Sequence, residues 1–274
     1  MPRQVLFLYN DPTAPEGLLG EMFTESGFDV STFSVVPPAR PDDPVLDVTF
    51  PDPLDYDVIV PLGARWAAYD EGVPWIADES AMVRRALDAG VGVLGVCFGG
   101  QLLAQALGGT VARSPEPEVG WYDVHSDDPA LVPPGPWFQW HFDRLTPPPG
   151  AVEVARNARA TQAFVRGRAL GLQFHPEVDT ALVQQWIDED HGGDITALGM
   201  DADELTARTA ELAADGARRL RLLVAGFLGL LAILGNYRGA TGRFFLRTNA
   251  GQDVTEDWML AGFLDLPAGL ERDN

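Results

Sequence analysis

The stretch VGVLGVCFGGQLLAQALGG, residues 91–109, contains the signals that decide the fold. Its first six residues form a continuous apolar run, which is typical of a strand buried on both faces of a parallel sheet. Residues 100–109 then have the pattern of a helix that ends at paired glycines. Between the two, Cys97 stands on a short turn, with Gly95 and Gly99 two residues away on either side. The stretch therefore predicts a strand, a sharp turn and a helix.

The same alternation of strand and helix extends toward the N-terminus. Apolar runs predict strands at 4–9 and 57–63, and alternation of apolar and polar residues predicts a strand at 29–33. Helical patterns follow the strands at 4–9 and 57–63, one through Leu18, Leu19, Met22 and Phe23 and one over residues 78–89. Such alternation predicts an α/β fold built on a doubly wound, mostly parallel sheet.

Beyond residue 109 the pattern changes to short strand-like segments with no helix between them. We expect them to form antiparallel additions to the sheet, followed by a helix over 179–189. The predicted strands are 121–126, 137–142, 151–156, 162–167 and 169–174.

The C-terminal part reads as a separate helical tail. We divide the chain into a domain of residues 1–198 and a C-terminal extension of residues 199–274, whose role the sequence leaves open. Leucines at steps of three, four and seven predict one long helix in this extension. The segment Leu222–Leu234 is apolar on every side for 13 residues, whereas a membrane span needs about 17–25 residues. We therefore expect this segment to pack against the body or against a second copy in a homo-oligomer, with no membrane anchor.

Composition excludes several classes of function. Forty acidic residues against nineteen basic ones give a formal net charge of −21, which repels nucleic-acid phosphates and anionic membranes. All nineteen basic residues are arginine, so the chain has no lysine for a Schiff base or a phosphate-binding loop. One cysteine forms no internal disulfide, and the N-terminus lacks the pattern of a signal peptide, which favours the cytoplasm.

The position of Cys97 is typical of a nucleophile. A sharp turn between strand and helix is the layout of a nucleophile elbow, and its neighbours must be small. The following helix places backbone N–H groups near the sulfur, which favours the thiolate. The alternative is that a lone cysteine serves as a small buried hydrophobe. This turn, however, has no structural need for a thiol.

A thiolate nucleophile in acyl transfer also needs a base, and the base needs an orienting partner. His175 directly follows a predicted strand in GLQFHPEV, residues 171–178, with Glu177 two positions on. Pro176 keeps the backbone extended, so both side chains point to one side. His141 is a second candidate, which either lines the pocket or caps a strand. No His, Cys or acidic cluster has metal-ligand spacing, and neither a metal nor a cofactor is expected.

These motifs together resemble a class I glutamine amidotransferase domain of the kind attached to GMP synthetase. The resemblance rests on GVCFGGQLLAQALGG, then QWHFD and GLQFHPEV, with PLG at 61–63 upstream, and it covers about residues 4–190. It implies a flavodoxin-like fold and a triad of Cys97, His175 and Glu177. It also implies that glutamine loses its side-chain ammonia through a γ-glutamyl thioester on the cysteine.

The resemblance implies further site residues. Gly63 and Phe98 match the two backbone donors of the oxyanion hole, and Gln101 matches a position that contacts glutamine. Trp140 and His141 lie on the strand that helps to hold the α-amino and carboxylate groups of the substrate. Trp140 stands where a serine is common among members that use glutamine.

These motifs are compatible with three functions. The first is a glutaminase, acting alone or supplying ammonia to a separate synthetase partner. The second is a hydrolase of small γ-glutamyl amides, which needs the same triad. The third is a binding or regulatory module without turnover, which the intact Cys97, His175 and Glu177 disfavour.

Overall fold

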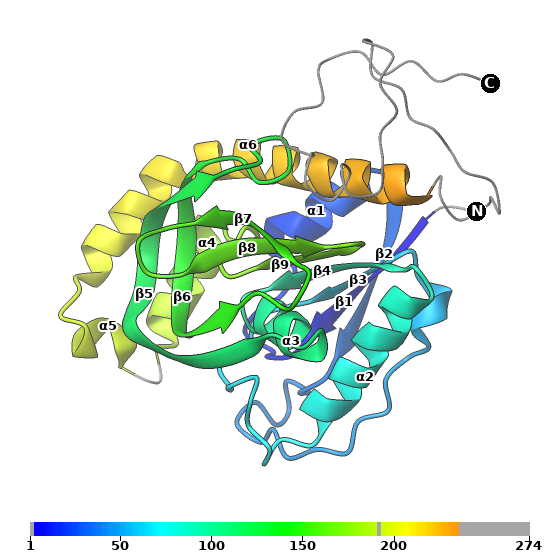
Figure 1. Ribbon diagram of the computed structural model, residues 1–274. Helices are drawn as coiled ribbons and strands as arrows, with labels where there is room; N and C mark the ends of the chain where they lie inside the picture. The colour runs from blue at the N-terminus through cyan, green and yellow to red at the C-terminus, as the bar shows by residue number, and fades with distance from the viewer. Residues whose placement is uncertain (1–2, 191–192, 236–274) are drawn as a thin grey trace, which may run out of the picture.

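A computed structural model describes residues 3–190 and 193–235, and its centre is a sheet of nine strands (Figure 1). The strand order is β2-β1-β3-β4-β9-β8-β7-β5-β6. The strands are β1 (Arg3–Tyr9), β2 (Phe28–Ser34), β3 (Val58–Pro61), β4 (Gly92–Val96), β5 (Thr110–Ser126), β6 (Gly135–Thr146), β7 (Val152–Arg156), β8 (Thr161–Arg166) and β9 (Ala169–Leu172). The helices are α1 (Gly17–Glu25), α2 (Trp75–Asp88), α3 (Phe98–Ala106), α4 (Thr180–Asp188), α5 (Asp194–Ala197) and α6 (Ala202–Gly235), with a short 3-10 turn, η1, at Pro53–Asp55.

The sheet is mixed. Strands β2, β1, β3, β4 and β9 pair in parallel, and β9, β8, β7, β5 and β6 pair antiparallel. Every residue of β3, β4 and β9 is buried, as their continuous apolar sequences predict. The predicted α/β fold with antiparallel additions is confirmed, and these additions are as extensive as the parallel part.

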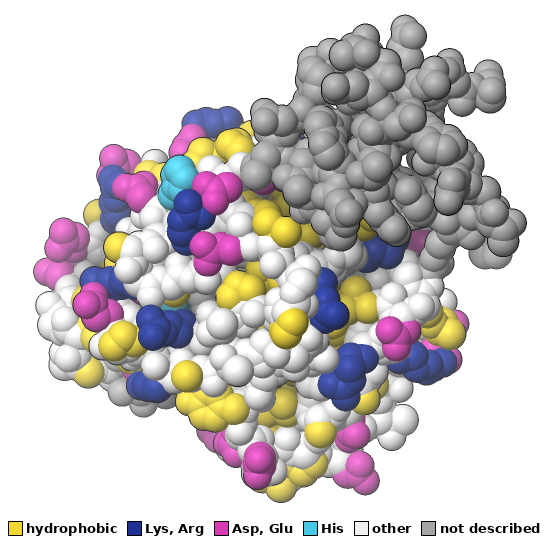
Figure 2. Space-filling model, in the orientation of Figure 1, with side chains coloured by type: hydrophobic (Ala, Val, Ile, Leu, Met, Phe, Trp, Pro, Cys, Tyr) yellow, Lys and Arg dark blue, Asp and Glu magenta, His cyan; other side chains and the backbone are white. Residues whose placement is uncertain are grey.

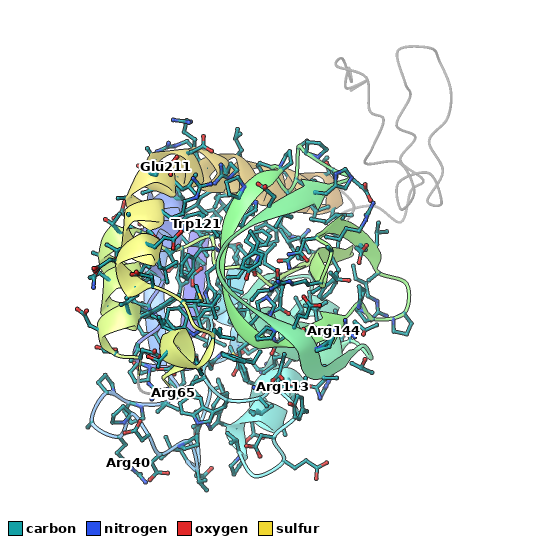
Figure 3. All side chains as sticks on the ribbon, turned by 90° about the vertical axis from the view of Figure 1, so that its left-hand side faces the viewer. Arg40, Arg65, Arg113, Trp121, Arg144 and Glu211 are labelled. Atoms are coloured by element: carbon teal, nitrogen blue, oxygen red, sulfur yellow. The ribbon has the colours of Figure 1, made fainter. Side chains whose placement is uncertain are left out.

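The ribbon of β5 and β6 is longer than the sequence predicts. Strand β5 has 17 residues, whereas the alternation in the sequence marks only its last six. Its first half contains Pro115 and Pro117, which lack backbone N–H donors and are more typical of a loop than of a strand. The structure accommodates them at a register shift between Arg113 and Glu118. In Figure 3, Arg113 and Arg144 lie at one end of this ribbon, and Trp121 lies toward α6.

Helices cover both faces of the sheet (Figure 1). Side chains of α1 and α6 share one apolar core with the sheet, and this core includes Cys97. Side chains of α2 and α3 form a second core on the opposite face, with Trp75 and Phe98 among its largest members. The turn at Cys97 therefore lies between two packed layers, which limits how far it can move.

The tail forms one long helix, as predicted, and α6 lies along the sheet and beside α1. Leu220, Leu223, Val224 and Phe227 are almost completely buried in the core of that face. Leu222, on the outer side of the helix, is 58% exposed. The body of the same chain therefore shields the sheet-facing side of the apolar segment, whereas its outer side is exposed. The boundary at residue 198 and homo-oligomer formation remain predictions. Residues 236–274 of the predicted extension lie outside the described residues.

Across residues 3–190 and 193–235, no helix combines the length and the apolar character that crossing a bilayer requires.

The packing of α6 predicts a large difference between two substitutions on this helix. Phe227→Ala is expected to lower the free energy of unfolding by about 3–5 kcal/mol, because it leaves a cavity in the core. Leu222→Ala, on the exposed side, is the matched control and is expected to change it by less than about 1 kcal/mol. Urea unfolding followed by tryptophan fluorescence measures both values. Equal effects of the two variants would contradict the described orientation of α6.

Candidate active site

Cys97 stands at the turn between β4 and α3. Its φ is 51° and its ψ is −107°, and it is the one residue other than glycine with a positive φ in the part of the chain that the structure describes. A Cβ on Gly99 would lie 2.0 Å from the carbonyl oxygen of Pro61, and one on Gly95 would lie 2.4 Å from that of Gly99. The turn therefore has the strained backbone and the small neighbours of a nucleophile elbow.

The Cys97 sulfur lies at the N-terminus of α3. The residue is 5% exposed, and its sulfur is 3.9 Å from the backbone carbonyl oxygen of Trp140 on β6. Its backbone N–H donates to the carbonyl oxygen of Leu172 at 2.9 Å, which fixes the turn to the end of β9. Cys97 thus stands where a helix start leaves backbone N–H groups without intrahelical acceptors.

His175 and Glu177 form a buried pair beside Cys97. The Nδ1 atom of His175 is 2.6 Å from Oε1 of Glu177, and both side chains are almost fully buried. Burial favours the neutral imidazole, but the Glu177 carboxylate and the Cys97 sulfur favour the cation more strongly. Together they raise the pKa of His175 to about 10. Since Nδ1 is held by the carboxylate, Nε2 is the ring atom left to exchange a proton with sulfur or substrate.

Backbone hydrogen bonds hold this pair from two other elements. The His175 N–H donates to the Phe138 carbonyl oxygen on β6 at 2.8 Å. The Leu18 N–H, at the start of α1, donates to the Glu177 carbonyl oxygen at 2.9 Å. The position of the base therefore depends on β6 and α1 as well as on its own strand.

Two backbone N–H groups near Cys97 have no acceptor. Gly63 follows β3, and a Cβ there would lie 3.0 Å from Cε1 of His175, so its backbone lies directly against the imidazole. Phe98 begins α3 next to the sulfur. Within residues 3–190 and 193–235, neither N–H donates a hydrogen bond. Both are thus available to a negatively charged oxygen, as the prediction of an oxyanion hole requires.

The three predicted substrate-contacting residues have partners within the protein. The Gln101 amide donates to the carbonyl oxygen of Asp143 at 3.2 Å. His141 lies with Nδ1 2.9 Å from the same carbonyl oxygen and Nε2 3.2 Å from the buried Glu118 carboxylate. The Trp140 indole donates to Asp194 on α5 at 2.9 Å, while its backbone carbonyl contacts Cys97. A role in substrate binding remains a prediction for all three.

Sequence reasoning did not identify Trp186 on α4. Its ring lies edge-on to the His175 imidazole at a centroid distance of 4.9 Å, and its indole donates to the Thr13 carbonyl oxygen at 2.7 Å. It also meets the Trp140 ring, 6.1 Å away and perpendicular. One aromatic residue on an amphipathic helix gives no signal of such a contact, because the ring that it meets is distant in the sequence.

Comparison with known proteins identifies the family to which this geometry belongs. The family described as glutamine amidotransferase class-I matches residues 59–187, a range that contains Cys97, His175 and Glu177. Residues 59–187 therefore form a class I glutamine amidotransferase domain. The predicted resemblance, and with it the prediction of an amidotransferase enzyme family, is confirmed.

Relatives of this amidotransferase domain include GMP synthases. That of Aeropyrum pernix is 38% identical over 115 residues, which make up 39% of this chain and 22% of the relative. That of Mycobacterium leprae is 32% identical over 189 residues, or 63% of this chain and 32% of the relative. Both are named as glutamine-hydrolysing enzymes. The chain thus spans less than a third of the length of these curated relatives.

Solved structures share the fold of the amidotransferase domain. A glutamine amidotransferase from Thermotoga maritima has a TM-score of 0.71 and 26% identity, covering 82% of this chain and 98% of its own. A glutamine amidotransferase from Methylobacillus flagellatus has a TM-score of 0.68 and 23% identity, covering 83% of this chain and 94% of its own. The second likeness concerns the fold alone.

Figure 2 shows how charged side chains are distributed over one face of the molecule. Arginine and acidic side chains are interspersed over this face of the amidotransferase, without a continuous basic patch.

Proposed function

We propose that this chain hydrolyses the side-chain amide of glutamine through a thioester on Cys97 and releases ammonia. The observation that carries the proposal is the strained Cys97 turn beside the buried His175–Glu177 pair. A strained nucleophile, a base and a carboxylate that orients the base make up the machinery of acyl transfer. The family of residues 59–187 supports the choice of an amide as substrate.

The proposed first half-reaction forms the thioester. The Cys97 thiolate attacks the side-chain carbonyl carbon, and the Gly63 and Phe98 N–H groups stabilise the oxygen that becomes negative. His175 donates the proton from Nε2 to the amide nitrogen as the C–N bond breaks, and ammonia leaves. Glu177 holds Nδ1 throughout and stabilises the imidazolium.

The proposed second half-reaction restores the enzyme. His175, now neutral, takes a proton from water, and the resulting hydroxide attacks the thioester carbon. The C–S bond then breaks, giving glutamate and the Cys97 thiolate. We propose that the ammonia passes to a synthetase partner, which the names of the GMP synthase relatives support. The cytoplasmic location expected from the sequence is part of this proposal.

A hydrolase of small γ-glutamyl amides is the second candidate. Trp140 occupies a position where glutamine-using members of the family commonly have serine, and its indole ring favours this hydrolase. With Trp186 it forms an aromatic wall next to His175. Such a wall binds a hydrophobic substituent on the amide nitrogen better than it binds a bare NH₂ group.

The experiment is a comparison of amides with the purified full-length chain. Ammonia release from glutamine is expected, with none from asparagine, whose shorter side chain places the amide away from the sulfur. The isolated protein is expected to hydrolyse glutamine slowly. Addition of a true synthetase partner is expected to raise the rate tenfold or more, which corresponds to lowering the activation free energy by about 1.4 kcal/mol. Fast turnover of one γ-glutamyl alkylamide and none of glutamine would establish the hydrolase instead. Absence of both turnover and a covalent Cys97 adduct would leave the non-catalytic module.

A further inference from the structure

Asn10 and Glu79 form a buried polar pair that the proposed reaction has not used. Asn10 directly follows β1, and Glu79 lies in the second turn of α2. Both side chains are completely buried. A buried polar group destabilises the folded state unless it is hydrogen-bonded, so the partners of these two side chains indicate their role.

The Asn10 side-chain amide donates two hydrogen bonds. One goes from Nδ2 to the Leu62 carbonyl oxygen at 3.2 Å, and the other goes from the same nitrogen to Oε1 of Glu79 at 3.1 Å. The Leu62 oxygen also accepts the Gly99 N–H, from the first turn of α3, at 3.2 Å. The carbonyl of Leu62 is therefore fixed by one side chain and by the helix that carries the nucleophile.

The Leu62 carbonyl and the Gly63 N–H belong to the same peptide group. No described peptide bond is cis, so this C=O and this N–H point in opposite directions from one rigid plane. Holding the carbonyl toward Asn10 consequently directs the N–H of Gly63 to the other side of the strand. On the C-terminal side of this plane stands a glycine, which allows the peptide to rotate more easily than any other residue does. An anchor on the carbonyl is what prevents that rotation.

Glu79 completes the anchor in its neutral form. Burial raises the pKa of Glu79 to about 8, so its carboxyl group carries a proton at neutral pH. Its Oε2 and the Asn10 Oδ1 are both buried and have no hydrogen-bond partner among the described residues. A protonated carboxyl and a primary amide pair through two hydrogen bonds, and these two atoms are the ones that the second bond requires.

We propose that Asn10 and Glu79 are positioning residues, which hold the Leu62–Gly63 peptide so that its N–H faces the oxyanion formed at Cys97. The inference rests on the proposed acyl transfer at this cysteine. Neither residue touches the substrate. Glu79 locks the Asn10 amide, Asn10 locks the Leu62 carbonyl, and the peptide plane transmits the constraint to the Gly63 N–H.

The test separates oxyanion stabilisation from nucleophilicity. Loss of one oxyanion donor lowers kcat by about 10²–10³-fold, and Asn10→Leu and Glu79→Met are expected to lower it by about 10–100-fold, since the peptide is freed but not removed. KM is expected to change little. Alkylation of Cys97 by iodoacetamide forms no oxyanion and is expected to keep its wild-type rate. Affinity for the aldehyde analogue of glutamine, whose adduct carries the oxyanion, is expected to fall in parallel with kcat.

Two further variants complete the design. Glu79→Gln offers the same acceptor and donor as a protonated carboxyl and is expected to recover most of the kcat lost in Glu79→Met. Asp78→Asn, on the exposed side of α2, removes a carboxylate next to Glu79 and serves as the matched control with wild-type kinetics. If Asn10→Leu does not fold, the comparison of Glu79→Gln with Glu79→Met decides alone.

Two results would overturn the inference. One is an unchanged kcat in folded Asn10→Leu or Glu79→Met, and the other is an equal loss of kcat and of Cys97 alkylation, which would indicate a merely structural role. Failure of the proposed function is a different result, because then the wild-type chain itself releases no ammonia from any amide. In that case the affinity for the aldehyde analogue still tests the positioning role. A lower affinity in both Asn10→Leu and Glu79→Met supports this role, and an unchanged affinity overturns it.

Discussion

Replacing Cys97 by alanine is expected to reduce amide hydrolysis by about a million-fold, to the rate that binding and the oxyanion donors give alone. In the proposed reaction the sulfur forms the thioester, and no second thiol can replace it, since Cys97 is the one cysteine in the sequence. Ammonia release from the purified variant measures the loss. Mass spectrometry with a glutamine-derived electrophile is expected to show one adduct on the wild-type chain and none on the variant.

A second substitution at the same position separates chemistry from strain. Cys97→Gly is expected to be as inactive as Cys97→Ala but more stable than it by about 1–3 kcal/mol, because glycine adopts φ near 51° without the steric cost that a Cβ carries. Urea unfolding of the two variants gives the difference. Equal stabilities would show that the backbone at the turn is unstrained, and residual hydrolysis in either variant would remove Cys97 as the nucleophile.

Replacing His175 by alanine is expected to be nearly as damaging, again by about a million-fold in kcat, because both proton transfers use its Nε2. Glu177→Ala is expected to cost less, about ten-thousand-fold, since this carboxylate orients the base and does not itself transfer the proton. Single-turnover kinetics with glutamine compares the two. A Glu177 variant as inactive as the His175 variant would contradict the assigned roles.

Stability should depend on pH through the same pair. The pKa of His175 is raised in the folded protein, so the folded state binds its proton more tightly than the unfolded chain does. The resulting stabilisation is fully present below a pH of about 6.5, the ordinary value for histidine. It is lost as the pH rises through about 10. Glu177→Gln removes the carboxylate that raises this pKa, so the stability difference between wild type and variant is expected to shrink from pH 6.5 to pH 10. A constant difference would contradict the charged pair.

The features that sequence predicted best are those encoded within a few residues. The Cys97 turn needs only the glycines beside it, and His175 reaches Glu177 across one proline, so both patterns are visible in short stretches. Among the parallel strands before residue 97, β1, β3 and β4 are equally local, because burial on both faces makes each one a continuous apolar run.

The features that sequence did not predict depend on distant pairings. Asn10 and Glu79 are 69 positions apart, and neither is unusual in its own segment. His141 lies opposite Glu118, directly after a register shift in β5. The two prolines at this shift make the sequence resemble a loop. Which face of α6 packs against the sheet was not predictable for a related reason. The second half of the helix is apolar on every side, so its sequence pattern does not distinguish the buried face from the exposed one.

The position of β9 in the sheet sets an order of events during synthesis. This strand pairs with β4 on one side and β8 on the other, so the middle of the sheet is filled by a segment that follows β8 in the chain. Until residues 169–172 emerge from the ribosome, β4 and β8 each present an unpaired edge, which is a hazard for association with other chains. The same segment anchors the Cys97 N–H and leads directly into His175. Because His175 follows β9, a nascent chain acquires the proposed base only as the middle of the sheet is filled.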